Sequence, residues 1–217
     1  MEREYRFIAG GNRELPSLEA ITNEFFEAVE FLKQFNITET EIVLNKALSD
    51  GKTILGEGSQ AAMLDIDHGT YPHVTSSSTT AAGACSGLGI SPKKIGEIFG
   101  IAKAYCTRVG NGVFPTELFD ELGNEIRIKG NEFGSNTGRP RRIGWLDLPA
   151  LKYAVMINGV TQLVLTKADV LSGLKSVAVC THYELEDGTI QSVSGILPET
   201  AKPILKWMNG WDADFSI

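Results

Sequence analysis

The first part of the chain has the spacing of apolar residues that is typical of helices. Between residues 17 and 35, apolar side chains recur at three- and four-residue steps, which predicts a helix with one apolar face. Thr38 and Glu41 match a capping box, so a second helix is expected to begin there and to end near Gly51. Residues 1–50 are therefore expected to form a helical lead-in to the rest of the chain.

Beyond Gly51, strand patterns alternate with helix signals. Short apolar or alternating runs predict strands at 52–56, 102–109 and 161–165, and helices are expected at 79–89, after Ser91-Pro92 with Ile95, Ile98 and Phe99 facing inward, and between Asp147 and Gly159. The run at 161–165 is almost continuously apolar, as in strands that are buried on both faces of a parallel sheet. The alternation predicts an α/β fold with a mostly parallel sheet flanked by helices.

The pattern changes near Ser176. Residues 176–184 and 189–195 alternate like strands on either side of Glu186-Asp187-Gly188, which predicts an antiparallel hairpin added to the sheet. We expect the segment 176–217 to hold this hairpin and a C-terminal helix. No internal repeat or low-complexity linker divides residues 1–217, so a single domain is expected.

Composition narrows the class of protein. The 217 residues are 42% hydrophobic and 22% charged, with a formal net charge of -7, which is typical of a soluble globular protein. An acidic chain lacks the excess of Lys and Arg that a nucleic-acid surface needs, and no apolar run approaches the roughly 20 residues that span a bilayer. Cys85, Cys106 and Cys180 lack C-x-x-C spacing and are expected to be buried free thiols in a reducing compartment. We therefore expect a cytoplasmic protein that binds neither nucleic acid nor membrane.

One short loop is positively charged, although the chain as a whole is acidic. Arg139, Arg141 and Arg142 concentrate positive charge after Gly134 and Gly138, where the backbone can turn tightly and approach a ligand closely. Guanidinium groups, together with hydroxyl and amide donors, favour the binding of carboxylates or phosphates. The alternative is a solvated basic loop that binds nothing.

Three more polar segments follow apolar runs, where ligands of α/β sheets bind. Gln60 has an amide that can donate to and accept from a base edge. The hydroxyl run that begins at Thr75 suits phosphate or, alternatively, only caps the next helix. Lys167 and Asp169 follow the strand expected at 161–165. A carboxylate can accept hydrogen bonds from N1–H and the 2-amino group of guanine, whereas adenine offers no such pair, and the lysine stem can cover the base.

Two other patterns are similar to ligand-binding motifs but are interpreted as structural. Gly51-Lys52-Thr53 is similar to the end of a phosphate-binding P-loop, but the glycine that the motif requires before it is missing. His68 and His73 are spaced neither for a helical pair nor for a familiar zinc site. Asp65 and Asp67 are expected to be solvated or to stabilise turns. No metal site is therefore predicted within this sequence.

Taken in order, a series of short segments resembles the adenylosuccinate synthetase family, from about residue 50 to 175. They are Gly56-Glu57-Gly58-Ser59-Gln60, Leu64-Asp65-Ile66-Asp67-His68-Gly69-Thr70-Tyr71-Pro72, Val74-Thr75-Ser76-Ser77, Lys103-Ala104-Tyr105, Thr107-Arg108-Val109-Gly110, Phe114-Pro115-Thr116-Glu117-Leu118, Thr137-Gly138-Arg139, Arg141-Arg142, Gly144-Trp145-Leu146-Asp147 and Thr166-Lys167-Ala168-Asp169-Val170-Leu171. The ordered series is much more specific than any single motif within it.

The resemblance implies a ligase that joins IMP to L-aspartate with GTP and Mg²⁺. In this family GTP phosphorylates the 6-oxygen of IMP, and the amine of aspartate displaces that phosphate. The resemblance assigns IMP to Gln60, Thr75 and Arg139. It assigns aspartate to the loop of Ser135, Asn136, Thr137, Gly138, Arg139, Pro140 and Arg141, and GTP to Arg141, Lys167, Ala168 and Asp169. It also implies a homodimer.

The resemblance also implies what this sequence lacks. The family's phosphate loop, its catalytic aspartate and histidine, and its Mg²⁺ ligands have no counterpart in residues 1–217. We therefore expect a single partial domain, with 51–175 as its nucleotide- and substrate-binding part, that contains no catalytic residue and is inactive alone. Ala61 stands where the family usually has glycine, and Pro140 stiffens the arginine loop.

Three alternatives to this function stay open, and one of them is a remnant that only packs, which predicts neither nucleotide binding nor turnover. The chain can be part of a synthetase that acts on a different purine monophosphate, such as the type that forms 2-aminoadenylosuccinate. It can also be a non-catalytic module that binds purine nucleotides without chemistry. The module predicts nucleotide binding and no turnover even when the missing region is supplied.

Overall fold

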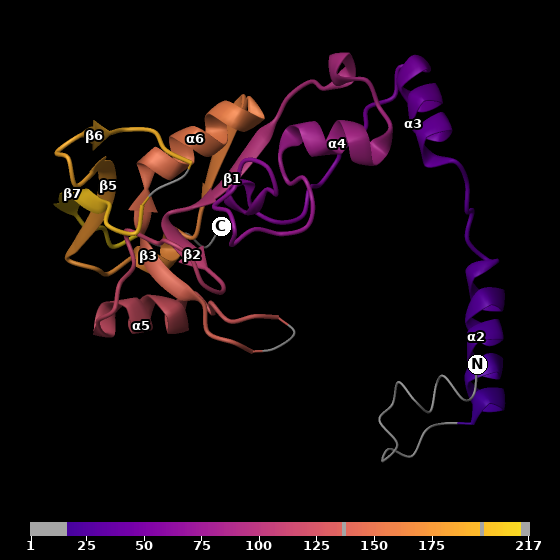
Figure 1. Ribbon diagram of the computed structural model, residues 1–217, viewed down its shortest axis with the longest axis horizontal. Helices are drawn as coiled ribbons and strands as arrows, with labels where there is room; N and C mark the ends of the chain where they lie inside the picture. Colours follow the sequence, from indigo (N-terminus) through magenta and orange to yellow (C-terminus); the bar gives the residue numbers. More distant parts are fainter. Residues whose placement is uncertain (1–16, 136–137, 196–197, 214–217) are drawn as a thin grey trace.

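The computed structural model describes residues 17–135, 138–195 and 198–213. Figure 1 shows an elongated molecule, in which the strands and the helices α5 and α6 form a body and α2 and α3 lie far from it at the other end. Helix α4 lies between the two parts. The predicted ligand segments that the structure describes all belong to the body or to its connection with α4.

The two helices of the first part differ in how they begin. In α2 (Leu18–Leu32), Oγ of Ser17 accepts a hydrogen bond from the N–H of Ala20 at 3.0 Å, which satisfies one donor of the first turn. Helix α3 (Thr40–Ser49) has Glu39 as its N-cap, with no side-chain cap, so the predicted capping box is wrong. Neither helix has a buried residue.

A small sheet consists of two parallel strands, β1 (Phe99–Lys103) and β4 (Gln162–Thr166). The strand predicted at 161–165 is therefore confirmed. Its predicted burial is wrong, because Leu165 is 52% exposed. No other strand of the described residues pairs with these two. Leu163, Val164 and Leu165 are all exposed, so the apolar side chains of β4 stay open to solvent on both faces.

The larger sheet has five strands, which are β2 (Tyr105–Arg108), β3 (Arg142–Asp147), β5 (Ser176–Glu184), β6 (Ile190–Gln191) and β7 (Lys202–Asn209). Strand β3 pairs antiparallel with β2 and parallel with β5, and β5 pairs antiparallel with both β6 and β7. The predicted hairpin and the α/β class are confirmed. This sheet is mixed rather than mostly parallel, because β3 and β5 form its parallel pair and its other pairs are antiparallel.

The predicted C-terminal helix is wrong, because residues 202–209 form β7. Half-buried Pro203 and Leu205 alternate with exposed neighbours, as in a strand with one covered face. The strand pairs along β5 from Ser176↔Asn209 to Glu184↔Lys202, with an irregular step near Cys180. A long antiparallel partner outweighs any local helix preference.

Two other predicted elements do not form. Residues 52–56 have no strand partner, and Leu55 is 91% exposed. After Ser91 only a short 3-10 turn (Pro92–Lys94) appears, and Phe99 already belongs to β1. The pairing of β1 with β4 therefore determines the structure here, although the apolar residues that lead into β1 have the spacing of a helix. Two further 3-10 turns are Ala62–Leu64 and Asp169–Leu171.

Helices α4 (Ala81–Leu88) and α6 (Leu148–Asn158) form where the sequence predicts them. The side chain of Asp147 accepts from the N–H of Ala150 at 3.1 Å, and Gly159 ends α6 in the left-handed conformation. Helix α6 packs against β5, and α5 (Glu121–Lys129) packs against β3. Figure 1 shows these two helices on opposite sides of the larger sheet.

The main core lies between α5 and the larger sheet. Ile126 of α5 packs there with Ile143 and Trp145 of β3 and with Val177 of β5. A smaller cluster around Cys180 and Tyr183 lies under β7. Among the described residues, no helix is long and apolar enough to cross a membrane.

Candidate functional site

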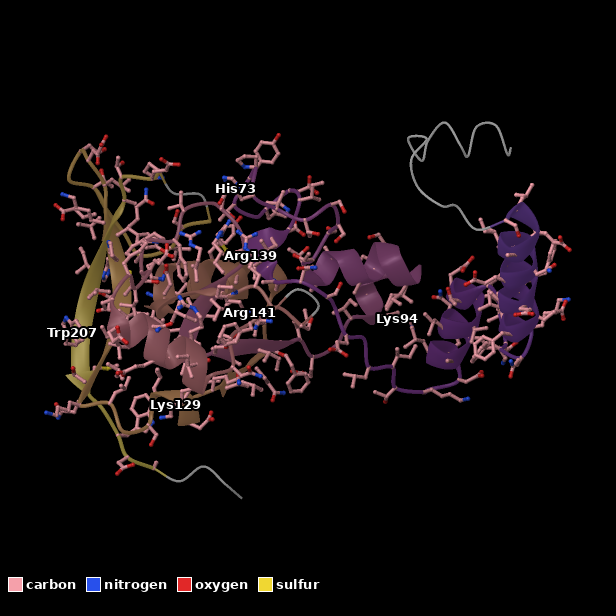
Figure 2. All side chains as sticks on the ribbon, turned by 90° about the horizontal axis from the view of Figure 1, so that it is seen from below. His73, Lys94, Lys129, Arg139, Arg141 and Trp207 are labelled. Atoms are coloured by element: carbon pink, nitrogen blue, oxygen red, sulfur yellow. The ribbon has the colours of Figure 1, made fainter. Side chains whose placement is uncertain are left out.

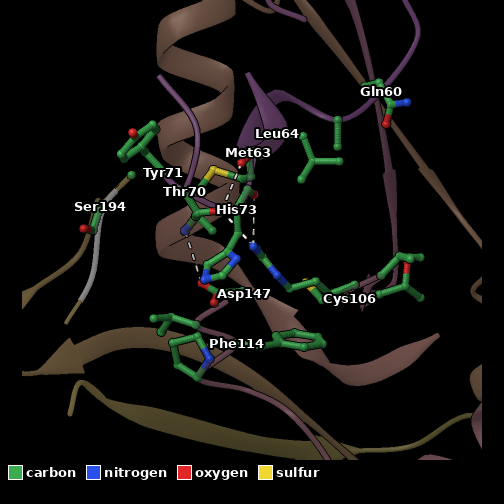
Figure 3. Close-up of a pocket in the computed structure, with 18 of the residues that line it drawn as sticks. Gln60, Met63, Leu64, Thr70, Tyr71, His73, Cys106, Phe114, Asp147 and Ser194 are labelled. Atoms are coloured by element: carbon green, nitrogen blue, oxygen red, sulfur yellow. Dashed lines mark hydrogen bonds between the residues drawn. The ribbon is translucent and has the colours of Figure 1, made fainter. Parts of the chain in front are cut away.

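A cavity of about 560 Å³ opens in the body (Figure 3). Its walls come from the segment 60–73, from β2 and the turn after it, from Arg141 just before β3, from the end of β3 and the start of α6, from Tyr183 of β5 and from the stretch after β6. In Figure 3, Gln60 and Ser194 lie at opposite sides of the cavity. Cavities of this size hold small ligands such as nucleotides.

Asp65 holds the segment 60–80 in shape. Its carboxylate is fully buried and accepts from four backbone N–H groups, those of Asp67 at 2.9 Å, His68 at 3.0 Å, Thr79 at 2.6 Å and Thr80 at 3.2 Å. Burial raises the pKa of Asp65, but these hydrogen bonds outweigh it and lower the pKa to about 2. The predicted turn-stabilising role of Asp65 is confirmed.

Arg108 joins this segment to the end of β2. Its guanidinium donates to Oγ1 of Thr70 at 2.9 Å, to the carbonyl of His73 at 3.3 Å and to the carbonyl of Asn111 at 2.9 Å. Burial, with a smaller effect from Arg142, lowers the pKa of Arg108. Arg108 lines the cavity, yet the sequence analysis assigned it no role. Its place between a strand end and a glycine turn is the signal that could have singled it out.

The three arginines of the basic loop have different surroundings. Arg142 donates to both carboxylate oxygens of Glu117 and to the carbonyls of Gly110 and Gly112, so it holds the structure together. Arg141 lines the cavity. Arg139 is exposed, and Figure 2 shows it with Arg141 in the body, far from α2. Of the three, only Arg141 is part of the cavity lining.

The loop that carries them is closed by its own backbone. The N–H of Gly138 donates to the carbonyl of Gly134 at 2.8 Å, and the N–H of Gly134 donates to the carbonyl of Arg139 at 2.8 Å. Gly138 has a φ of +63°, which favours glycine. Asn136 and Thr137 lie outside the described residues. The two glycines thus make the tight turn that the sequence predicts.

A buried carboxylate lies behind Arg141. Glu132 accepts from Nζ of Lys103 at 2.7 Å, from the hydroxyl of Tyr105 at 2.7 Å and from Nη1 of Arg141 at 2.6 Å. Burial raises its pKa, but these three donors outweigh burial and lower the pKa below its ordinary value. We call Glu132, Lys103, Tyr105 and Arg141 the Glu132 cluster. The sequence analysis did not single out Glu132, because its partners come from distant segments.

The predicted guanine segment lies outside the cavity. Lys167 has a φ of +62°, and its Nζ donates to the carbonyl of Gly130 at 3.1 Å. The indole N–H of Trp211 donates to the carbonyl of Ala168 at 3.1 Å. Asp169 is exposed, and its charge contributes to a raised pKa of Tyr105, after burial and Glu132. This segment therefore lies near the Glu132 cluster.

The described non-glycine residues with positive φ are few. They are Gln60 at 71°, Asn131 at 52° and Lys167 at 62°. Such backbone conformations cost about 1–3 kcal/mol each and gather at functional sites. Gln60 and Lys167 are predicted ligand residues, and Asn131 precedes Glu132.

Thr75 is not part of the cavity lining but bonds to a residue that is. Its N–H donates to the carbonyl of Leu64 at 2.8 Å, and Leu64 lines the cavity. The hydroxyls near Thr75 do not cap α4 in the predicted way, because its N-cap Thr80 makes no side-chain hydrogen bond. Oδ1 of Asn158 instead accepts from the N–H of Ala81 at 2.8 Å.

Asp147, Tyr183 and Cys106 also line the cavity. Burial raises the pKa of Asp147, and the hydroxyl of Tyr183 donates to its carboxylate. Burial also raises the pKa of the Cys106 and Cys180 thiols to about 12. Both stay protonated near neutral pH and are poor nucleophiles. All three cysteines are free, as predicted, although only Cys180 is fully buried.

The described residues do not fit a magnesium site. No three His, Cys, Asp or Glu side chains within 17–135, 138–195 and 198–213 gather closely enough to hold a metal ion. The carboxylates of Asp65 and Glu132 are occupied by N–H and O–H donors. Oxygen ligands for Mg²⁺ would have to come from elsewhere.

The fold and the cavity define an α/β protein with room for a small ligand beside a positively charged loop. The model of the family "Adenylosuccinate synthetase" matches residues 2–217. The chain therefore belongs to the adenylosuccinate synthetase family.

Curated relatives support this family. The adenylosuccinate synthetase of Cytophaga hutchinsonii is 56% identical over 194 residues, which are 88% of this chain and 45% of the relative. That of Bacteroides fragilis is 48% identical over 214 residues, which are 99% of this chain and 50% of the relative. The chain thus spans about half the length of the curated relatives it matches.

Solved structures show the same relation. Fully ligated adenylosuccinate synthetase from Plasmodium falciparum matches with a TM-score of 0.87 and 39% identity, over 98% of this chain and 51% of that one. The succinoaminodeoxyadenylate synthetase of cyanophage S-2L matches with a TM-score of 0.52 and 22% identity, over 65% of this chain and 44% of that one. At such low identity the second match concerns the fold alone.

Proposed function

We propose that this chain supplies the substrate-binding part of a GTP-dependent ligase that joins IMP to L-aspartate. The observation that carries the proposal is that one cavity brings together Gln60 and Arg141, which are far apart in the sequence and have both been assigned to substrates. Membership of the adenylosuccinate synthetase family supports it. The positive φ of Gln60 and Lys167 supports it further, because strained backbone gathers at functional sites.

Each predicted residue then has a role that its chemistry permits. The amide of Gln60 would bind the purine edge of IMP, the hydroxyl of Thr75 its ribose phosphate, and Arg139 both IMP and the aspartate carboxylate. The loop of Ser135, Asn136, Thr137, Gly138 and Pro140 would surround aspartate. Arg141, Lys167, Ala168 and Asp169 would bind GTP, with Asp169 accepting from N1–H and the 2-amino group of guanine.

The chemical steps themselves depend on groups outside this chain. GTP phosphorylation of the 6-oxygen of IMP needs a general base and Mg²⁺, and no three His, Cys, Asp or Glu side chains of the described residues gather to hold a metal ion. In this proposal the chain binds and orients substrates, and the rest of a family-length protein supplies the catalytic groups. We propose that this protein is a cytoplasmic homodimer.

Calorimetric titration with GTP and ATP tests the guanine role. We expect GTP to bind at least about tenfold more tightly than ATP, because Asp169 pairs only with guanine. Asp169→Asn should abolish the preference, while Asp187→Asn, at an exposed carboxylate in the hairpin turn, should preserve it. Equal affinities of the unaltered chain for GTP and ATP would contradict the proposal.

The same method separates the alternative substrates. Tighter binding of IMP than of dGMP would support adenylosuccinate formation. Tighter binding of dGMP, which the cyanophage S-2L protein holds in its solved structure, would favour a different purine monophosphate. A family-length protein that binds nucleotides without turnover would favour the non-catalytic module.

A further inference from the structure

Glu132 has a position that the proposed substrate contacts do not explain. Its side chain is only 1% exposed, and it is not part of the cavity lining. Its partners come from the end of β1, from β2 and from the residue before β3. A buried carboxylate with three donors is costly to place and strongly fixes the groups around it.

Arg141 is held at three points, and Glu132 supplies two of them. Its N–H donates to the carbonyl of Glu132 at 3.0 Å, and Nη1 donates to Oε2 of Glu132 at 2.6 Å. Nε of Arg127 donates to the Arg141 carbonyl at 2.8 Å. Within the described residues, the Arg141 guanidinium has no acceptor besides Glu132, so its other N–H groups stay available on the cavity side.

The charges of the Glu132 cluster do not cancel. Two cations, Lys103 and Arg141, face a single carboxylate. The cluster therefore keeps a positive charge, and Arg141 carries it to the cavity wall. An anion at this wall would meet a guanidinium that is already oriented, so binding would lose little side-chain entropy.

The turn that carries Glu132 also holds the guanine segment. The carbonyl of Gly130 accepts a hydrogen bond from Nζ of Lys167. Asn131, which follows Gly130 and precedes Glu132, has a positive φ. Residues 130–132 thus contact Arg141 on one side and Lys167 on the other. We propose that Glu132 is a positioning residue, which orients Arg141 toward the phosphate groups of GTP without touching the nucleotide. This inference rests on the proposed function.

A double-mutant cycle between Glu132 and Arg141 tests the proposal, with the affinity for GTP measured by calorimetry on the full chain. We expect Glu132→Gln and Arg141→Ala each to weaken GTP binding about tenfold. The double variant should bind no more weakly than Arg141→Ala alone, because Glu132 acts through Arg141. Losses that simply add would overturn the proposal.

Two controls separate positioning from stability. Glu117→Gln breaks a second glutamate–arginine pair, with Arg142, and should leave the affinity for GTP within about twofold of the unaltered chain. The affinity of Glu132→Gln for IMP should also stay within about twofold, because Gln60 and Arg139 are intact. An equal loss of IMP and GTP binding would assign Glu132 a merely structural role. If Glu132→Gln does not fold, Glu132→Asp replaces it in the same cycle.

The cycle also distinguishes this inference from the proposed function. If the unaltered chain binds neither GTP nor IMP, the proposed function fails. The same cycle is then measured with inorganic pyrophosphate as the anion. Coupled losses would uphold the role of Glu132, whereas additive losses or no binding of pyrophosphate would overturn it.

Discussion

The two sheets of this protein contain similar apolar strands in opposite surroundings. In the larger sheet, Trp145 of β3 is 1% exposed because α5 and neighbouring strands cover it. In the small sheet, Leu165 of β4 lies in an equally apolar run and is half exposed. An apolar strand sequence thus shows which residues can be buried, but neighbouring elements decide which are buried.

Trp145→Ala should have the largest effect. Removing a buried tryptophan from the main core should lower the free energy of unfolding by about 3–5 kcal/mol, because it leaves a cavity. Leu165→Ala is the matched variant in the small sheet and should change stability by about 0.5 kcal/mol or less. Urea unfolding followed by fluorescence measures both. Equal losses would mean that β4 is covered in solution.

Asp65→Asn should have the next largest effect on stability. Asp65 lies in a segment that belongs to neither sheet. The amide loses charge-assisted hydrogen bonds from four backbone N–H groups, so we expect a loss of about 2–3 kcal/mol. The pKa of Asp65 is lowered to about 2 from 3.8. Its contribution is therefore fully present well above pH 3.8 and is lost as the pH falls toward 2.

The pH dependence provides the control. Unfolding measured between pH 6 and 2, on the order of the range in which carboxylates titrate, should show a smaller acid-induced loss for Asp65→Asn than for the unaltered chain. Asp67→Asn, at the exposed neighbour, should keep the full loss. Identical pH profiles for all three proteins would contradict the role of Asp65.

Gly144→Ala and Gly100→Ala compare the sheets at the scale of one methyl group. A Cβ at Gly144 of β3 would lie 2.7 Å from the ring of Phe114 and 2.7 Å from the carbonyl oxygen of Thr116. Since backbone cannot move aside easily, we expect a loss of about 1–3 kcal/mol. At Gly100 of β1 the nearest atom is a side-chain methyl of Val160 at 2.9 Å, which can rotate away.

A lower melting temperature for Gly144→Ala than for Gly100→Ala would support this difference between the sheets. The opposite order would mean that the small sheet is the more tightly packed of the two.

Local signals allowed much of the fold to be predicted. Helix α6 follows from Asp147, Pro149 and Gly159, because each of these residues acts within one helical turn. Strand β7 could not be found in this way. Its conformation depends on pairing with β5, and no local feature of 202–209 reports that partner.

The residues of the candidate site likewise include some that local sequence could indicate and others that depend on distant partners. The basic loop, Gln60 and the segment at Lys167 carry recognisable residue types in short stretches, so they could be singled out as candidates. Glu132 could not, because Lys103, Tyr105 and Arg141 reach it only after folding. Residue type alone could not separate Arg141 from Arg142 either, because their different carboxylate partners, Glu132 and Glu117, come together with them only in the fold.

The turn held by Asp65 has a consequence for the timing of local motions. One carboxylate holds the amides of Asp67 and His68 together with those of Thr79 and Thr80. If that carboxylate leaves its place, all of these amides lose their acceptor at once. They therefore form a single unit for hydrogen exchange with solvent, which opens and closes as a whole. The cavity wall between Gln60 and His73 is therefore fastened twice, by this unit and by the hydrogen bonds of Arg108 to Thr70 and His73.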